Sequence, residues 1–467
     1  MWNQPLIQQN KRRARLLLYL SPLFIASVCL LIIHLAKDLG FDWAKVDFEE
    51  FESVQLLQEY LRIDTSYPTG SELAGAEWLA RQFEAMGLRA HVEKVGDHHA
   101  NMWAILDGED PKALVLLNHI DTEPVLAPEK WNHPPFGAVI DGPFIFGRGS
   151  FDMKSVAIAQ LMAMRAIVEE GRTPRRSLMF LATGDEERGS RLGVQRWIQR
   201  HPDLFERVGA VLTEGGTVEA LSLDTVKYWG TEYGQKYFID MTVCDASAER
   251  LALLRAQLLQ ETDGVLREPS PEVADFFRAY APSRERPEFQ TLLAQPETML
   301  ESPEFAVASK RMLAWLRNSF VISPIMPNPE GGFQFHMILH LLPGTTFEEG
   351  WEELFPGDLF GFEYSIDIQH PPVEFSPLDH EIYRTIDAYM AEVRPKAPHG
   401  PMLVPWSSTD SRFFRVHGIP AYGFSPFHIL TGDAVGMRGD DERMALVPFI
   451  EGVELYQGLV ERLVFGE

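Results

Sequence analysis

Two patterns of apolar residues alternate along the chain between about residues 48 and 231. Residues 51–63 and 75–88 carry apolar side chains at the spacing of a helix that buries one face. Residues 154–171 form a longer apolar stretch that ends in a glycine, as expected for a buried helix with a glycine just after its last turn. These stretches predict helices.

Three shorter apolar runs, at 113–119, 177–187 and 209–216, end abruptly in polar residues and predict strands. Strands that alternate with helices in this order are typical of an α/β fold, with a mostly parallel sheet and helices on both of its faces. The carboxyl ends of parallel strands meet at one edge, where such sheets bind their ligands. We therefore expect the polar residues at these strand ends to lie together.

The residues at the expected edge are a histidine and several acids. The first run ends in His119, with Asp121 two residues later; Glu186 and Glu187 end the second, and Glu214 the third. Histidine nitrogens and carboxylate oxygens are ligands that zinc accepts. Alone, each of these short motifs is more often structural. Their convergence on one sheet edge favours chemistry.

The paired glutamates need a compensating charge, because neighbouring carboxylates repel each other. A divalent cation beside Glu187 would offset the repulsion and leave Glu186 free to take a proton from water. Asp121 can hydrogen-bond the second ring nitrogen of a ligating histidine, and Asp152, just before a predicted helix, offers another carboxylate. The pattern predicts a metal centre with a free base.

The N-terminal part has a different pattern. Four basic residues precede a nearly unbroken apolar run at 16–36, which is long enough for a helix to cross a bilayer. A cleaved signal peptide would have a shorter apolar region and a small-x-small site, which we do not find. We expect a basic cytoplasmic tail at 1–15, a transmembrane anchor at 16–36, and the rest on the non-cytoplasmic side of the membrane.

Composition changes this picture little. The 467 residues suffice for two or more domains, and a formal net charge of −25 argues against a nucleic-acid partner. The only cysteines are Cys29 and Cys244, and Cys29 lies in the apolar N-terminal run, so a disulfide framework is not expected.

Several motifs occur in a fixed order: "LLNHIDTEPV", "FGRGSFDMK", "GDEERGSRLG" and "TEGG". Together they resemble the zinc amidohydrolase family that includes aminoacylase, carboxypeptidase G and carboxypeptidase S. The N-terminal anchor and the His-x-Asp…Pro-Val motif look most like those of the branch of carboxypeptidase S and N-acyl-amino-acid hydrolases. No single motif is specific, but the ordered set is.

The resemblance implies a site with two zinc ions, or with manganese or cobalt in their place. In this reading Asp152 bridges the ions, His119 and Glu214 complete one site, and Glu187 serves the other. Glu186 is then the general base. Asp121 orients the ligating histidine.

The resemblance also implies a smaller α+β lid at 234–372, inserted between the two halves of a catalytic domain at 45–233 and 373–467. Family members often form a homodimer through this lid. A histidine of the early lid usually helps to polarise the scissile carbonyl, but this chain has no histidine between residues 215 and 335. The Pro- and Glu-rich segment 281–305 is expected to be a surface excursion of the lid.

Two arginines stand at informative positions. Arg438, in "MRGDDER", occupies the place of the family's last histidine ligand, and arginine has no lone pair for a metal. The second metal site is then weakened or absent, with the guanidinium replacing part of its charge or contacting the substrate, unless His428 is rerouted as a ligand. Arg412 is a candidate for binding a substrate carboxylate or, equally, for a buried ion pair with Asp410.

Two functions follow. The first is metal-dependent hydrolysis of an amide bond in an N-acyl amino acid or a short peptide with a free carboxylate, with water activated by Glu186. The alternative is a membrane-tethered pseudoenzyme that binds a peptide-like ligand or a partner. The retained ligand and base motifs favour the enzyme; Arg438 and the missing lid histidine favour the alternative.

Overall fold

The computed structural model describes residues 46–466, except 217, 223–224, 260–263, 304, 306–309, 356–360, 373, 406 and 431–435. The predicted tail at 1–15 and anchor at 16–36 lie outside this part of the chain. Within the described ranges, none of the helices combines the length and the apolar character needed to cross a membrane.

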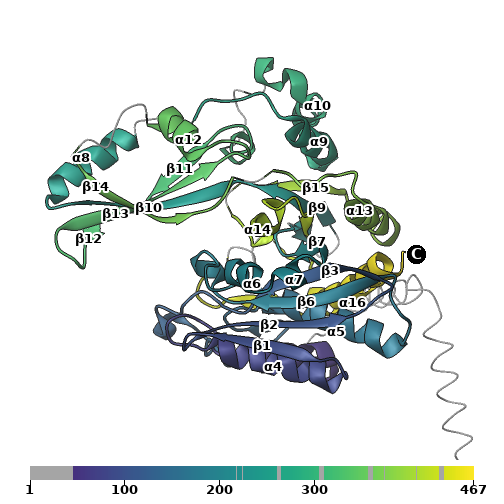
Figure 1. Ribbon diagram of the computed structural model, residues 1–467. Coiled ribbons are helices and arrows are strands. Elements are labelled where there is room, and N and C mark those ends of the chain that lie inside the picture. Colours follow the sequence, from purple (N-terminus) through teal and green to yellow (C-terminus); the bar gives the residue numbers. More distant parts are fainter. Residues whose placement is uncertain are drawn as a thin grey trace, which may run out of the picture.

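The main sheet is mixed, and its middle is parallel (Figure 1). Its strands run in the order β1-β2-β6-β3-β7-β16-β9-β15, with β8 beside β9. Strands β6, β3, β7 and β16 are parallel to one another, and β1 and β2 pair antiparallel with their neighbours. Strand β9 pairs antiparallel with β16 and β8 and parallel with β15. The bounds are β1 Ala90–Val95, β2 His99–Leu106, β3 Asp110–His119, β6 Arg176–Thr183, β7 Val208–Thr213, β8 Val218–Ser222, β9 Thr225–Gln235, β15 His399–Val404 and β16 Ala421–Gly423.

Helices cover both faces of this sheet, as predicted. Along β3, Leu114 and Leu116 join one hydrophobic cluster, and Val115 and Leu117 join another, because successive side chains of a strand point to opposite faces. The first cluster includes α3 (Glu52–Leu61), α4 (Glu72–Ala85), α5 (Lys154–Glu170), α13 (Glu381–Val393) and α16 (Leu446–Phe465). The second includes α6 (Val194–Arg200), α7 (Pro202–Phe205) and α14 (Ser411–Arg415).

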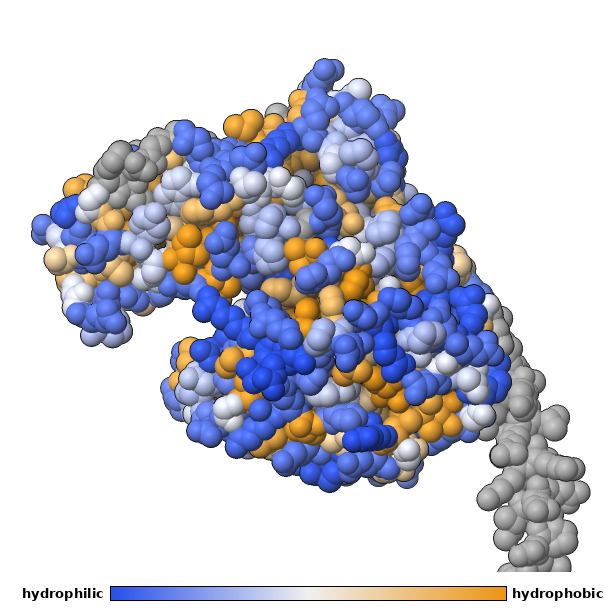
Figure 2. Space-filling model, in the orientation of Figure 1, coloured by the Kyte–Doolittle hydropathy of each residue, from blue (hydrophilic) through white to orange (hydrophobic). Residues whose placement is uncertain are grey.

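A second, antiparallel sheet projects from the main body and has its own hydrophobic cluster (Figure 1). It contains β10 (Tyr237–Asp245), β11 (Ser319–Ile322), β12 (Met326–Pro327), β13 (Phe333–Leu341) and β14 (Glu363–Gln369), with α8 (Ala248–Leu258) and α12 (Phe347–Leu354). It falls within the predicted lid range 234–372, whose bounds stay a prediction. The space-filling view shows a largely hydrophilic recess between this part and the main body (Figure 2).

The segment expected as a surface excursion of the lid is folded onto the main sheet instead. Helix α10 (Pro287–Ala294) lies in this segment and contacts α9 (Pro271–Tyr280), and Leu292, Leu293 and Met299 join the larger cluster of the main sheet. The Pro and Glu content was misleading, because Pro287 and Pro296 begin helical turns and Glu285, Glu297 and Glu301 are exposed.

The remaining elements are short. Strands β4 (Val139–Asp141), β5 (Phe144–Phe146) and β17 (Arg443–Ala445) form a three-stranded sheet, and α11 spans Lys310–Leu313. Strand β17 follows directly on the loop that carries Arg438. Its pairing with β5 therefore ties the end of that loop to the segment before Asp152.

Helix α12 offers a test of the second sheet's stability. Thr346 and Glu349 form a capping box at its first turn. Thr346→Ala removes an N-cap and should destabilise the protein by about 1 kcal/mol, measured as a lower midpoint in urea or thermal unfolding. Thr291→Ala is the matched control, because it removes the same atoms from an exposed position inside α10. An equal loss in both variants would contradict the capping role.

Candidate active site

The predicted convergence of strand ends is confirmed. His119 is the last residue of β3, and Glu214 directly follows β7. Strand β6 ends at Thr183 and leads into a short 3-10 helix, η4 (Glu186–Arg188), which contains both paired glutamates. Since β3, β6 and β7 are parallel, these residues meet at one edge of the sheet.

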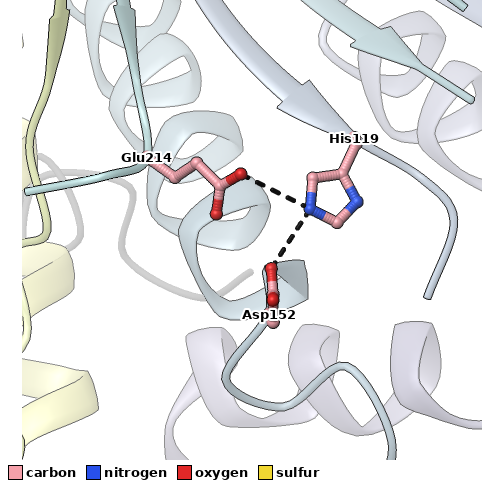
Figure 3. Close-up of side chains that lie close together, drawn as sticks. All are labelled: His119, Asp152 and Glu214. Carbon is pink, nitrogen blue, oxygen red and sulfur yellow. Dashed lines mark hydrogen bonds and ion pairs between the residues drawn. The ribbon is translucent and has the colours of Figure 1, made fainter. Parts of the chain in front are cut away.

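Three of the predicted ligands form a compact cluster. Nε2 of His119 lies 3.2 Å from Oδ1 of Asp152 and 3.6 Å from Oε1 of Glu214 (Figure 3). One donor atom from each residue lies within 4.8 Å of the others, and the histidine and aspartate are buried. Asp152 reaches this place from the segment just before α5. The cluster can hold a divalent cation.

The site contains more negative charge than its own cations balance. Burial and the charge of Asp152 raise the pKa values of Glu187 and Glu214 well above the usual range. Burial alone would lower the pKa of His119, but the neighbouring carboxylates outweigh it and raise that pKa well above its ordinary value. Without a metal, these shifts favour the protonated forms of His119, Glu187 and Glu214. One histidine with two carboxylates is a donor set that suits zinc, so a metal fits here.

Asp121 holds two parts of the site together. Its main-chain carbonyl lies 2.8 Å from Nδ1 of His119, while its carboxylate is 3.6 Å from the same nitrogen. The carboxylate accepts hydrogen bonds from the main-chain N–H groups of Glu186 (3.1 Å) and Glu187 (3.0 Å). Asp121 thus contacts the histidine as predicted, but mainly through its backbone, and its side chain fixes the turn with the paired glutamates.

Glu186 is a buried acid beside the cluster. Burial, together with the charge of Asp410, raises its pKa to about 7 against the opposing effects of His119 and Arg412. Its main chain is held by the Asp121 carboxylate. A carboxylate whose pKa lies near neutrality is suited to accept and return a proton, and a nearby bound cation would lower this pKa.

Arg412 lies next to the predicted base and is almost fully buried, with 1% of its side chain exposed. Its guanidinium lies 3.9 Å from Glu186 and 3.6 Å from Asp410, and Nη1 donates to the carbonyl of Thr409 at 2.6 Å. Ser190 donates a short hydrogen bond to Asp410. These contacts match the ion-pair reading, while binding of a substrate carboxylate by Arg412 stays a prediction.

Arg438 reaches the place that the resemblance assigns to a second metal. Its Nε lies 2.7 Å from Oδ2 of Asp152, and its Nη2 lies 2.9 Å from Oε2 of Glu187. His428 does not join the cluster, because its Nε2 bonds to the carbonyl oxygen of Ser222. The residues present therefore do not fit a second metal ion.

Glu442 is a residue beside the site that sequence reasoning missed. Its Oε1 accepts hydrogen bonds from the main-chain N–H groups of Phe151 (2.9 Å) and Asp152 (3.2 Å). Its Oε2 lies 2.7 Å from Nη1 of Arg148, and both side chains are buried. Glu442 therefore fixes the main chain of the predicted ligand Asp152. The sequence feature that could have identified Glu442 is its position in "MRGDDER", the motif that also contains Arg438.

The second sheet contacts the turn that follows the paired glutamates. Nη2 of Arg191 donates to the main-chain carbonyl of Asp367 at 2.6 Å, and a side chain at Gly189 would meet Ile368 at 3.2 Å. Another group of potential ligands lies on this sheet: Asp240, His336 and Asp367. This sheet therefore touches the turn that carries the predicted base.

Two other histidines of this region are buried and neutral. Burial and Lys236 lower the pKa of His340 to about 4. Burial and Arg412 lower the pKa of His370, just after β14, to about 2. A neutral, buried histidine can donate or accept a hydrogen bond but carries no charge. No sequence motif pointed to His370 as a residue near the site.

Comparison with known proteins identifies the family. The model of "Peptidase family M20/M25/M40" matches residues 115–462. Aminoacylase-1 of Homo sapiens is 26% identical over 442 residues, covering 89% of this chain and 96% of the relative. Aminoacylase-1 of Pongo abelii is 25% identical over 439 residues, with the same coverage.

Solved structures share the fold. The M20 family metallo-carboxypeptidase Sso-CP2 of Sulfolobus solfataricus has a TM-score of 0.67 at 17% identity and covers 88% of this chain and 99% of its own. Human carnosine dipeptidase 1 has a TM-score of 0.66 at 16% identity and covers 90% and 98%. With the family match over most of the chain and the ligand cluster at the sheet edge, this protein belongs to peptidase family M20/M25/M40 and is a metallohydrolase that acts on amide bonds.

Proposed function

We propose that this chain hydrolyses the amide bond of an N-acyl amino acid or a dipeptide with a free carboxylate, with Glu186 as the general base. The observation that carries the proposal is the buried Glu186 beside the cluster of His119, Asp152 and Glu214. A binding module would not need a base poised near neutrality next to a set of metal ligands.

The ligand cluster defines where the reaction takes place. His119, Asp152 and Glu214 would hold a zinc ion or a similar cation. When bound, the cation would polarise the scissile carbonyl and make a water molecule more acidic. Asp121 keeps Glu186 beside this place by accepting the hydrogen bond from its main-chain N–H.

Glu186 then moves the proton. Its ionised carboxylate takes a proton from the attacking water and returns it to the nitrogen of the departing amine. Arg412, 3.9 Å away, favours the ionised form of Glu186 and opposes the effects of burial and of Asp410. The acid and base roles thus fall to one side chain.

The substrate class rests on similarity. Relatives named aminoacylase-1 match nearly their whole length. In the structure, the Arg438 side chain lies beside the cluster and is 41% exposed, so a substrate can reach it. Together with the predicted role of Arg412, this supports a substrate that carries a free carboxylate.

The test compares zinc-loaded and zinc-depleted protein on N-acetyl amino acids, on dipeptides and on the same compounds with an amidated carboxyl group. We expect turnover only with zinc, and a decrease in kcat/KM of roughly 10- to 100-fold on amidation, because the charge-assisted pair is lost. Release of the free amino acid or amine is followed by chromatography. Zinc-loaded protein that turns over none of these compounds would overturn the proposal and fit the pseudoenzyme alternative.

Three further features stay proposals. The apolar run at 16–36 would anchor the protein in a membrane, with the hydrolase on the non-cytoplasmic side. Membership of the carboxypeptidase S branch and a homodimer through the second sheet rest on resemblance alone.

A further inference from the structure

Asp152 separates two places in the active site. Its Oδ1 faces His119 at 3.2 Å, on the side where Glu214 also lies. Its Oδ2 faces Arg438 at 2.7 Å, on the side of Glu187. The first place has nitrogen and oxygen donors for a metal. The second already contains a cation that belongs to the chain.

The loop that carries Arg438 is anchored shortly after this residue. The Asp441 carboxylate accepts hydrogen bonds from the main-chain N–H of Asn132, at 2.7 Å, and from the side-chain amide of Asn132. Glu442 accepts from the main chain of Asp152, and its own carbonyl accepts from Gly147 N–H at 2.9 Å. These bonds hold the main chain shortly after Arg438, and the guanidinium itself is held by Asp152 and Glu187.

Too few ligands remain for an ion at the second place. Arginine stays protonated and has no acceptor atom, so it cannot coordinate a metal. One oxygen of Glu187 and one of Asp152 are paired with the guanidinium, and the other oxygen of Asp152 faces His119. Of these four carboxylate oxygens, Oε1 of Glu187 is the one without a hydrogen-bond partner among the described residues. Zinc sites normally have at least three protein ligands.

We propose that the active site binds a single metal ion, at His119, Asp152 and Glu214, and that the guanidinium of Arg438 permanently takes the position of a second cation between Asp152 and Glu187. The proposal concerns the same site as the proposed function, but it counts ions and does not depend on which substrate is turned over. Because Arg438 is always charged, part of the positive charge at the site does not depend on bound metal.

This arrangement has a specific consequence for Glu187. In the proposed site it pairs with arginine and is not a metal ligand, although the sequence predicts it as one. Glu187→Ala should then leave the number of bound ions unchanged, whereas His119→Ala should remove the ion. In a two-metal site, both substitutions would lower the count.

The experiment measures zinc bound per chain in the full-length protein, by titration calorimetry of metal-depleted protein and by elemental analysis after removal of excess zinc. We expect about one zinc per chain, and about two in Arg438→His, which restores a nitrogen ligand at this position. Two ions at the active site of the unaltered protein, or none at saturating zinc, would overturn the proposal. An unchanged count in a folded Arg438→His variant would also overturn it.

A control is needed because the second sheet offers another potential site. His336→Ala removes the histidine from the group of Asp240, His336 and Asp367. If the unaltered protein binds two ions and His336→Ala binds one, the extra ion lies on the second sheet and the proposal holds. If Arg438→His does not fold, judged by circular dichroism, Glu187→Ala decides, since a fall in its count would overturn the proposal.

Discussion

Replacing Glu186 with glutamine is expected to slow amide hydrolysis by about two to four orders of magnitude in kcat, which is the usual contribution of a general base. Glutamine keeps the shape of the side chain and the main-chain N–H that Asp121 holds, but it cannot accept a proton from water. The predicted ligands His119, Asp152 and Glu214 are untouched, so metal content should not change.

The fold should tolerate this substitution. Burial raises the pKa of Glu186 to about 7 in the metal-free chain, so the folded state favours the protonated acid. Its ionisation therefore costs stability as the pH rises from the unfolded pKa through about 7, and glutamine removes this cost. At pH 8 the metal-free variant should unfold at a temperature no lower than the unaltered protein does.

Single-turnover and steady-state rates, with zinc content from the same samples, check this prediction. Glu129→Gln is a matched control, because it is the same chemical change on an exposed 3-10 helix outside the site, and it should leave kcat unchanged. Unchanged turnover in Glu186→Gln with normal zinc content would remove Glu186 from the mechanism. Loss of both zinc and turnover would make Glu186 a ligand and not a base.

The sequence predicted which residues meet at the sheet edge because His119 and Glu214 stand directly at the ends of strands. His119 and Glu214 follow apolar runs whose length and β-branched or leucine content mark buried strands. The carboxyl ends of adjacent parallel strands lie at the same edge of a sheet, so these positions meet there independently of the rest of the fold. Asp152 precedes a long apolar helix and could be placed in the same way.

The supporting residues could not be predicted, since their partners are far away in the sequence. Glu442 contacts Asp152 across 290 residues, and Ser190 contacts Asp410 across 220. No local pattern encodes which distant N–H or hydroxyl will face a buried carboxylate. These contacts depend on how the two halves of the main domain come together.

Amino-acid composition gave a wrong prediction for the segment 281–305, which has polar residues on its outer side and apolar residues on its inner side. The segment 281–305 is rich in proline and glutamate, yet Leu292, Leu293 and Met299 are buried against the main domain. The apolar residues occur at irregular intervals between short helical turns, so no single helical period reveals them. The lid boundary drawn from family resemblance could not show which sheet this segment covers.

Replacing Glu442 with alanine should have the largest effect on stability, about 3–5 kcal/mol, because it leaves Arg148 as an unpaired charge in the interior. Only 3% of the Arg148 side chain and 1% of the Glu442 side chain are exposed. The N–H groups of Phe151 and Asp152 lose their acceptor as well. Since these bonds place Asp152, zinc affinity should also fall, by about 10- to 100-fold.

Chemical denaturation of metal-free protein and calorimetric zinc titration separate the two effects. Glu297→Ala is the matched control, because this glutamate pairs with Arg278 at the surface and should cost less than about 1 kcal/mol. Combining Glu442→Met with Arg148→Met removes both charges, so much of the lost stability should return, while zinc still binds weakly because Asp152 lacks its anchor. Recovery of full zinc affinity in the double variant would show that charge alone, and not the placement of Asp152, links Glu442 to the metal site.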